Sequence, residues 1–250
     1  MAFQALLVAI FITLNGGVFS EYFNWVVAGS PLITGSITGL LLGDFQTGAL
    51  VGAAIQLVTM GNITVGGVNS FDKRYASIIG TAVTIVSHQS VEVGLTLAVS
   101  LGTLGLIANN IWMTVNVAFV HMADRYVEKG ETKRLWVYNW LLPNLLIALV
   151  YGVPAFLAVY FGAEYLEGLM AMLPAAVTTA LTAVGSVLPA LGIAMMLKVV
   201  YKPKFVAFVV VGYLAVAYMG FNIMACAILG TACAVLYWTL NIDRLAREDA

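Results

Sequence analysis

Apolar residues form long runs along this chain, separated by glycine, proline and short polar stretches. The first run, residues 3–19, is barely long enough to cross a hydrocarbon core of about 30 Å, which takes around 20 helical residues. We expect it to end near Asn15, Gly16 and Gly17. No Lys or Arg precedes it, so it is interpreted as a retained membrane helix and not as a secretory signal.

The next apolar segments are short. Pro31 opens a glycine-rich helix, where its missing N–H costs nothing in a first turn, and Gln46–Met60 continues the apolar pattern. Each piece is short for a full crossing, so a re-entrant hairpin and two separate spans both stay open. Residues 76–87 are too few to span unless they begin or end within protein.

Longer apolar runs follow at 91–120, 135–162, 169–200 and 205–240. Between the first two lies a strongly hydrophilic loop, 124–134, whose four Lys/Arg residues place it in the cytoplasm by the positive-inside rule. Prolines are expected to kink or break the middle runs. The last run would measure roughly 54 Å as one helix, so we predict a hairpin with a break near Gly220 and Asn222.

Glycines recur at positions 35, 39, 43, 48 and 52. Their spacing puts small residues on one helical face, which lets another helix backbone approach closely in lipid. The sequence leaves open which partner fills this face. We therefore expect the chain to be poorly stable and inactive when it is alone.

The stretch from Gly35 to Gly80 also gathers polar side chains that the rest of the chain avoids, namely Asp44, Gln56, Asn62, Thr64, Asn69 and Asp72. Glycines at 61, 66 and 67 free the backbone between them from helical geometry. Polar groups on irregular backbone at membrane depth are tolerated only inside protein or beside a wet cavity, so we predict a substrate site here. The alternative is that Asp44 and Asp72 lie in aqueous loops and the amides only join helices.

Composition supports an integral membrane protein. The chain is 62% hydrophobic and 9% charged, whereas about a quarter of the residues of a soluble domain are charged. A net charge of −1 gives no sign of a nucleic-acid partner. Cys226 and Cys233 stand about 10 Å apart on one helix, which is beyond disulfide reach. The sequence contains no metal-ligand spacing and no phosphate-binding glycine loop. No cofactor is expected, and any phosphate donor must be another protein.

Broken helices in transporters often belong to inverted halves that meet near the membrane midplane. We therefore predict an all-α polytopic integral membrane protein with broken and re-entrant helices, related inverted halves and one membrane domain over 1–250. The segments 35–67 and 174–189 are the pair proposed for the two halves.

An ordered series of motifs resembles the enzyme IIC subunit of the mannose, fructose and sorbose family of bacterial phosphotransferase systems. These motifs are PLITGSITGLLLGDFQTGALVGAAIQL (31–57), MGNITVGG (60–67), DKRYASI (72–78), SHQS (87–90), VAFVHMAD (117–124), GSVLPALGIAMMLK (185–198) and ILGTACAVLY (228–237). The resemblance covers nearly the whole chain. It implies a multi-pass subunit of the bacterial cytoplasmic membrane that carries a hexose or amino sugar and is not itself an enzyme.

The same resemblance implies partners: a membrane D subunit, soluble A and B subunits that carry the phosphoryl group, and a higher-order oligomer of C–D pairs. It places the sugar-contacting segment at Gln56, Asn62, Thr64, Asn69 and Asp72, and amides and carboxylates match the donors and acceptors of sugar hydroxyls. Relatives in this family have an acidic residue at the position of Gln56 and an asparagine at that of Thr64. Both departures keep hydrogen-bonding ability and leave the identity of the sugar open.

Two other functions fit the residues. An ion-coupled secondary transporter of a small polar solute also needs buried carboxylates and broken helices. A membrane scaffold would use its polar residues only to join helices. His88 and His121 are interpreted as interfacial or hydrogen-bonded histidines, because the resemblance assigns the phosphohistidines to the A and B subunits.

Overall fold

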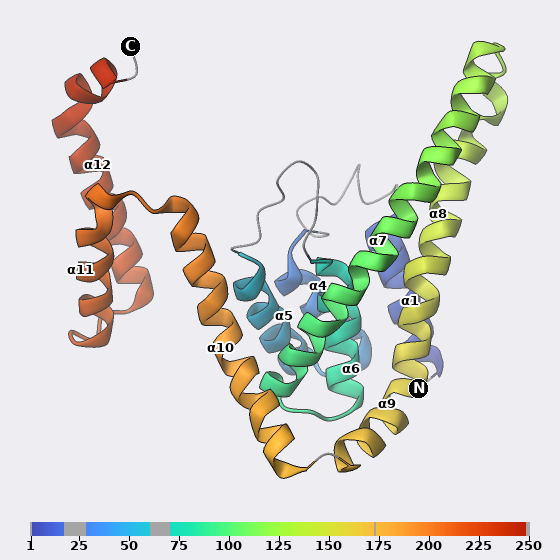
Figure 1. Ribbon diagram of the computed structural model, residues 1–250, viewed down its shortest axis with the longest axis horizontal. Coiled ribbons are helices and arrows are strands. Elements are labelled where there is room, and N and C mark those ends of the chain that lie inside the picture. The colour runs from blue at the N-terminus through green and yellow to red at the C-terminus, as the bar shows by residue number, and fades with distance from the viewer. Residues whose placement is uncertain (1, 18–28, 61–70, 173, 249–250) are drawn as a thin grey trace. The chain divides into compact units, whose positions relative to one another are not determined.

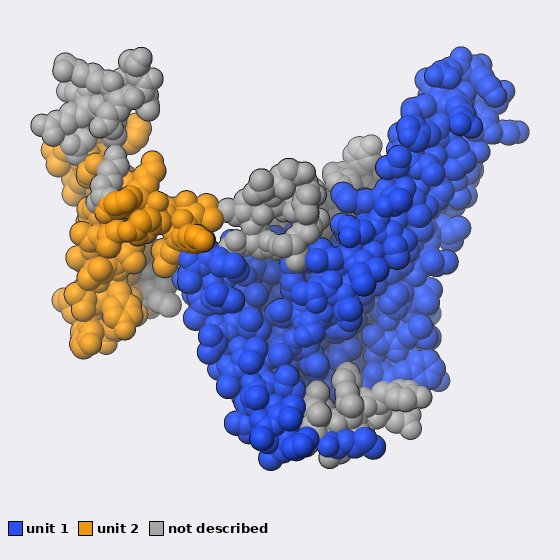
Figure 2. Space-filling view, in the orientation of Figure 1, with its two compact units in different colours: residues 1–196 blue, residues 197–250 orange. Residues whose placement is uncertain are grey.

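The computed structural model describes residues 2–17, 29–60, 71–172 and 174–248, and every element among them is helical (Figure 1). The chain divides into two compact units, residues 1–196 and 197–250 (Figure 2). Three helical segments are long and apolar enough to cross a membrane: Val91–Glu128, Val137–Gly162 and Ala175–Val200. The prediction of a single membrane domain stays a prediction.

The first of these segments, α7 (Val91–Glu128), is longer than the sequence indicated. The predicted hydrophilic loop at 124–134 is wrong for its first half, because α7 continues to Glu128 and the turn is confined to residues 129–131. No glycine or proline interrupts 124–128, so nothing stops the helix there. Gly130, with a φ of 72°, supplies the left-handed residue that ends it.

The second segment carries two prolines and remains helical. It runs through a π-turn at Val137–Leu141 (η3), α8 (Leu142–Ile147), a second π-turn at Ala148–Gly152 (η4) and α9 (Val153–Met172). Pro154 has no N–H to donate to the carbonyl of Val150, four residues earlier. The hydroxyl of Tyr75 donates to that carbonyl instead, at 2.8 Å. At the predicted break the helix therefore continues through a widened turn, and the Val150 carbonyl that Pro154 leaves unpaired is hydrogen-bonded by a neighbouring helix.

Two short helices, α4 (Pro31–Leu42) and α5 (Phe45–Thr59), form a tight hairpin. Gly43, with a φ of 89°, makes the turn. Asp44 caps α5 by accepting a hydrogen bond from the Thr47 amide at 3.0 Å. For Asp44, the turn position and this capping contact favour the simple structural role over a place in a substrate site.

The glycine face is filled by the hairpin itself. A Cβ added at Gly48 would lie 2.6 Å from the Cα of Gly39, and one added at Gly35 would lie 2.8 Å from the Cα of Gly52. The two helices therefore touch backbone to backbone. The predicted close approach of another helix backbone is confirmed, and the partner that the sequence left open is the other half of the same glycine pattern. The expectation that all five glycines share one helical face is wrong, because the break at Gly43 divides them between α4 and α5.

A short helix occupies the centre of unit 1. It consists of η1 (Tyr75–Gly80) and α6 (Thr81–Val86), and every residue from Tyr75 to Ser87 is buried. Helix α1 (Ala2–Gly16) and η4 contribute to the core around it, through residues such as Ile12 and Val150. The segment is thus too short to span, as its sequence indicated, and lies within protein.

Helix α10 (Ala175–Val200) packs on this body through two glycines. A Cβ at Gly185 would collide with the Glu92 carbonyl, and one at Gly192 would collide with that of Leu57. The Thr96 hydroxyl donates to the carbonyl of Leu181 at 2.9 Å. This packing places the third long segment against α5 and α7.

The second unit contains η5 (Pro203–Phe205), α11 (Val206–Ala217) and α12 (Ile223–Glu248). The predicted break is confirmed, with Gly220 in the left-handed region at a φ of 67°. Both cysteines are free. In unit 1, a further short turn, η2 (Thr132–Arg134), follows the turn at residues 129–131 that ends α7.

The glycine contact predicts a large effect from one methyl group. Gly48→Ala places a Cβ against the backbone of α4 and should destabilise the protein by about 1–3 kcal/mol, as overpacking does. Thermal unfolding of the purified protein measures this. Gly230→Ala is the matched control, because nothing lies within 4 Å of that position and alanine favours a helix. Equal stability of Gly48→Ala and Gly230→Ala would contradict the contact.

Candidate functional site

Two of the five predicted site residues lie in the described structure. Gln56 is in the last turns of α5, and Asp72 precedes η1. Asn62, Thr64 and Asn69 fall within 61–70, outside the described residues. Gln56 and Asp72 therefore flank the segment that carries the other three.

Gln56 is half-buried and joins the open ends of the glycine hairpin. The Ser30 hydroxyl, at the start of α4, donates to its side-chain oxygen Oε1 at 3.2 Å. One turn further along α4, the hydroxyls of Thr34 and Ser77 lie 2.8 Å apart. Hydroxyl and amide groups thus connect α4, α5 and η1 at this end of the hairpin.

Asp72 is buried, with its side chain 4% exposed. One carboxylate oxygen, Oδ1, accepts hydrogen bonds from the backbone amides of Arg74 and Tyr75, both at 2.9 Å. Its own amide donates to the carbonyl of Gly102 in α7 at 3.0 Å. Asp72 therefore caps the central helix and fixes its start against α7.

The second carboxylate oxygen of Asp72 holds a buried tyrosine. The Tyr151 hydroxyl donates to Oδ2 at 2.8 Å and accepts from the Arg74 guanidinium at 3.1 Å. The guanidinium also lies 3.8 Å from the same carboxylate. This triad satisfies both oxygens of Asp72 internally and pairs its charge, as a charge at membrane depth requires.

Arg74 reaches further than Asp72 does. Its guanidinium lies within 3.5 Å of the Gly16 carbonyl of α1 and within 3.5 Å of Oδ1 of Asn109 in α7. It also stacks over the Tyr151 ring, 4.6 Å from its centroid, and lies 5.9 Å from that of Trp112. One cation therefore ties together α1, η1, α7 and η4.

Small residues make room for this cluster. A Cβ added at Gly105 would lie 2.7 Å from the Cβ atoms of both Asp72 and Tyr75, and one added at Gly16 would lie 3.0 Å from the Arg74 guanidinium. The glycines of α7 and α1 thus allow the charged residues to approach the helices directly.

Several buried polar atoms near these elements have no hydrogen-bond partner among the described residues. They are both amide atoms of Asn15, the ring nitrogen of Trp112 and the side-chain oxygen of Asn116. Trp112 and Asn116 follow Asn109 on α7 at spacings of three and four, so the three share one helical face. Buried donors and acceptors without a described partner therefore lie on the α7 face that contacts the Arg74 cluster.

The aqueous-loop alternative for Asp72 is contradicted by its burial. The structure also adds residues that the sequence interpretation did not select: Arg74, Tyr151 and Asn109. Arg74 follows Asp72 and Lys73 in the motif DKRYASI, and its neighbour Lys73 makes the two resemble an exposed basic pair. The usable signal was an arginine two residues after an aspartate within an apolar chain, because such charges pair with one another in membranes.

A family model described as "PTS system sorbose-specific iic component" matches residues 2–236. The chain belongs to this family. It is 30% identical over 214 residues to the mannose-specific EIIC component of Escherichia coli (strain K12), covering 84% of this chain and 79% of that protein. It is 31% identical over 213 residues to the sorbose-specific EIIC component of Lacticaseibacillus casei, covering 84% and 76%.

Two solved structures are similar to this EIIC chain. One, described only as a membrane protein, superposes with a TM-score of 0.81 at 28% identity and covers 94% of this chain and 95% of its own. The other is the mannose transporter ManYZ in complex with microcin E492, with a TM-score of 0.59, 27% identity and 96% of each chain covered.

These matches confirm the resemblance found in the sequence. The chain is the EIIC component of a mannose-family phosphotransferase system, a sugar-translocating subunit and a multi-pass protein of the bacterial membrane. Its fold is all-helical in the described residues, with three long apolar candidate spans.

The Asp72 triad predicts that one hydroxyl stabilises the fold. Tyr151→Phe removes a hydrogen bond to a charged group, a loss that costs roughly 1.5–3 kcal/mol, and should lower the thermal unfolding midpoint of the purified EIIC chain. Tyr160→Phe is the control, since Tyr160 lies on α9 with 44% of its surface exposed. An unchanged midpoint for Tyr151→Phe would show that the triad carries no stability.

Proposed function

We propose that this EIIC chain binds a hexose or amino sugar with Gln56, Asn62, Thr64, Asn69 and Asp72 and carries it for phosphorylation by a cytoplasmic B subunit. The observation that supports the site most directly is the position of Gln56. Among the described residues its half-buried amide has one side-chain hydrogen bond, accepted from Ser30, and it lies at the hairpin end that leads into 61–70. The relatives are named for mannose, sorbose, fructose and N-acetylgalactosamine, which supports a sugar of this general size.

Within this proposal the two described residues have different roles. The amide nitrogen of Gln56 has no hydrogen-bond partner recorded among the described residues, and it can donate to a sugar hydroxyl. Asp72 contributes chiefly by orienting Arg74 and Tyr151, since both its oxygens already accept hydrogen bonds. A sugar that contacts Asp72 directly would share it with these partners.

The proposed movement of sugar uses the α4–α5 hairpin as a re-entrant element. Its helices have 12 and 15 residues, about 18 and 22 Å of axial rise, and neither can cross a core of about 30 Å. The segments 35–67 and 174–189 are the proposed pair from related inverted halves. The expected proline break in the second segment is absent, because Pro189 lies inside the continuous helix α10. Contact of Gly192 in α10 with the Leu57 carbonyl in α5 supports an interface between these elements.

The proposed partners are a membrane D subunit, soluble A and B subunits, and an oligomer of C–D pairs. The similarity to the ManYZ mannose transporter supports the D subunit. Helix α11 supports the need for surrounding protein, because it has 12 residues, none of them buried. A helix that cannot reach across the hydrocarbon leaves terminal backbone groups that need partners there.

Gln56→Ala tests the site. The variant loses a neutral hydrogen bond to the sugar, worth about 0.5–1.5 kcal/mol, so sugar affinity should fall about two- to tenfold. It also loses the bond with Ser30, so a small decrease in the unfolding midpoint is expected. Binding is measured by calorimetry on the assembled complex. Gln46→Ala is the matched control, an exposed glutamine at the other end of the same helix.

The two variants separate site from scaffold. If Gln56→Ala and Gln46→Ala bind sugar equally well, Gln56 is no part of the site. Uptake in cells should also follow phosphoenolpyruvate and ignore an ionophore, and the opposite dependence would identify an ion-coupled transporter.

The partner proposal predicts that the EIIC chain purified alone binds sugar at least tenfold more weakly than the chain co-purified with a D-type subunit. Short helices such as α11 lack cover without the partner, so the isolated chain should also have the lower unfolding midpoint. Calorimetry on the two preparations measures the difference. Full affinity in the isolated chain would exclude an essential D subunit.

A further inference from the structure

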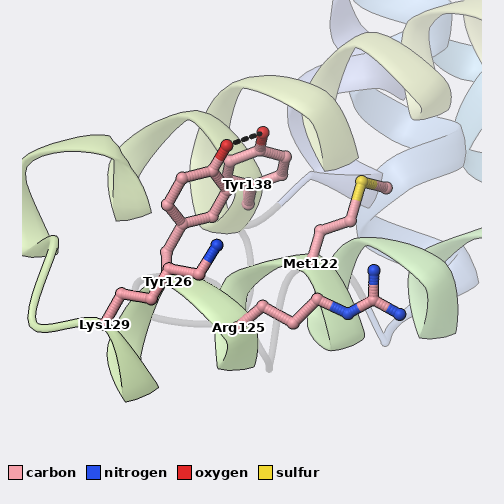
Figure 3. Close-up of a pocket in the computed structure, with 5 residues that line it drawn as sticks. All are labelled: Met122, Arg125, Tyr126, Lys129 and Tyr138. Atoms are coloured by element: carbon pink, nitrogen blue, oxygen red, sulfur yellow. Dashed lines mark hydrogen bonds between the residues drawn. The ribbon is translucent and has the colours of Figure 1, made fainter.

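A cavity lies where the end of α7 packs against η3, and none of the residues proposed for sugar binding lines it. It has a volume of about 230 Å³ and is lined by Met122, Arg125, Tyr126, Lys129 and Tyr138 (Figure 3). The two helical segments belong to the α7 hairpin, whose turn is at residues 129–131. None of the roles given to the EIIC chain above uses these residues.

The lining combines positive charge with aromatic surface. Arg125 and Lys129 are four residues apart on α7 and so share one helical face, and neither has an ion-pair partner among the described residues. The acidic residues of this hairpin, Asp124, Glu128 and Glu131, are absent from the lining. The cavity is therefore a cationic site within a hairpin whose bases and acids otherwise nearly balance.

Two tyrosines form one wall of the cavity. The rings of Tyr126 and Tyr138 stack with centroids 5.1 Å apart, and the Tyr138 hydroxyl donates to that of Tyr126 at 3.4 Å. Figure 3 shows the two rings side by side with the Lys129 side chain next to them, while the Arg125 side chain extends away from the rings past Met122. The wall offers hydroxyl groups and apolar ring faces to the same ligand.

The surrounding surface places this cavity at the edge of the membrane. Trp136 and Trp140 flank Tyr138 and are 57% and 51% exposed, and exposed tryptophans and tyrosines gather at headgroup level. Val120 and Val127 of α7, close to the cavity residues in the sequence, are 57% and 55% exposed. The lipid-facing surface thus extends as far as the two basic residues.

We propose that this cavity binds the phosphate of an anionic glycerophospholipid. Basic pockets between membrane helices bind such headgroups, with Arg125 and Lys129 contacting the phosphate and the tyrosine hydroxyls reaching the glycerol. Met122 and the ring faces suit the start of the acyl chains. A phosphorylated protein would need charge but no apolar wall, and the exposed tryptophans two residues before and after Tyr138 favour the lipid.

The test compares lipids retained by the EIIC chain in its purified complex. The protein is released from nanodiscs containing equal amounts of phosphatidylglycerol and phosphatidylcholine, and bound lipid is counted by native mass spectrometry. Arg125→Gln with Lys129→Gln should weaken phosphatidylglycerol binding roughly 30-fold, since each basic residue near the surface contributes about a factor of five. Lys198→Gln with Lys202→Gln removes the same charge elsewhere and should leave retention unchanged.

Four results would overturn the proposal. If both double variants lose phosphatidylglycerol equally, the effect comes from net charge and not from this cavity. If the wild type retains the two lipids equally, no site selective for anionic lipid exists. If the Arg125/Lys129 variant keeps its phosphatidylglycerol but loses phosphoenolpyruvate-dependent uptake, the surface docks a phosphorylated protein. Displacement of the lipid by millimolar inorganic phosphate alone would identify a free-anion site.

Discussion

The positive charge of Arg74 constrains how the helices of unit 1 pack together. In an apolar chain that is only 9% charged, a guanidinium inside the protein must be neutralised and hydrogen-bonded where it stands. Asp72 and Tyr151 provide this, and the Gly16 carbonyl and Asn109 complete the contacts. Each partner comes from a different part of the sequence, so the cluster can form only when four segments are correctly placed.

Close approach is the second condition for that arrangement, and the backbone provides it in two ways. Glycines at the contact points of α1, α4, α5, α7 and α10 remove the side chains that would hold the helices apart. The π-turns η1 and η4 carry Tyr75 and Tyr151, whose rings meet edge to face at 5.1 Å. Widened turns of this kind often occur at functional sites in helices, and here they orient the tyrosines that hold Val150 and Asp72.

The sequence predicted elements better than contacts. Hydrophobic runs and glycine or proline breaks located α1, α4, α5 and the C-terminal hairpin closely, because these signals are local. The extension of α7 into charged residues was missed, since polarity was taken for a loop when only Gly130 stops the helix. Asp72 could be selected as an ionisable residue in an apolar chain, but its partner Tyr151 lies 79 residues away and no local pattern connects them. Arg74 was overlooked for a related reason, as its neighbour Lys73 made it resemble a surface pair.

The inward-facing glycines of the α4–α5 hairpin leave its large side chains on the outside. Leu32, Leu40, Phe45 and Leu50 are all more than 40% exposed, while the seam between the helices admits no side chain. A neighbouring lipid or subunit thus meets a ridge of branched and aromatic groups, and recognition of this hairpin from outside depends on the shape of that ridge. The glycines and the leucines of one short sequence have separate tasks: the first set the thickness of the hairpin, and the second set what can lie beside it.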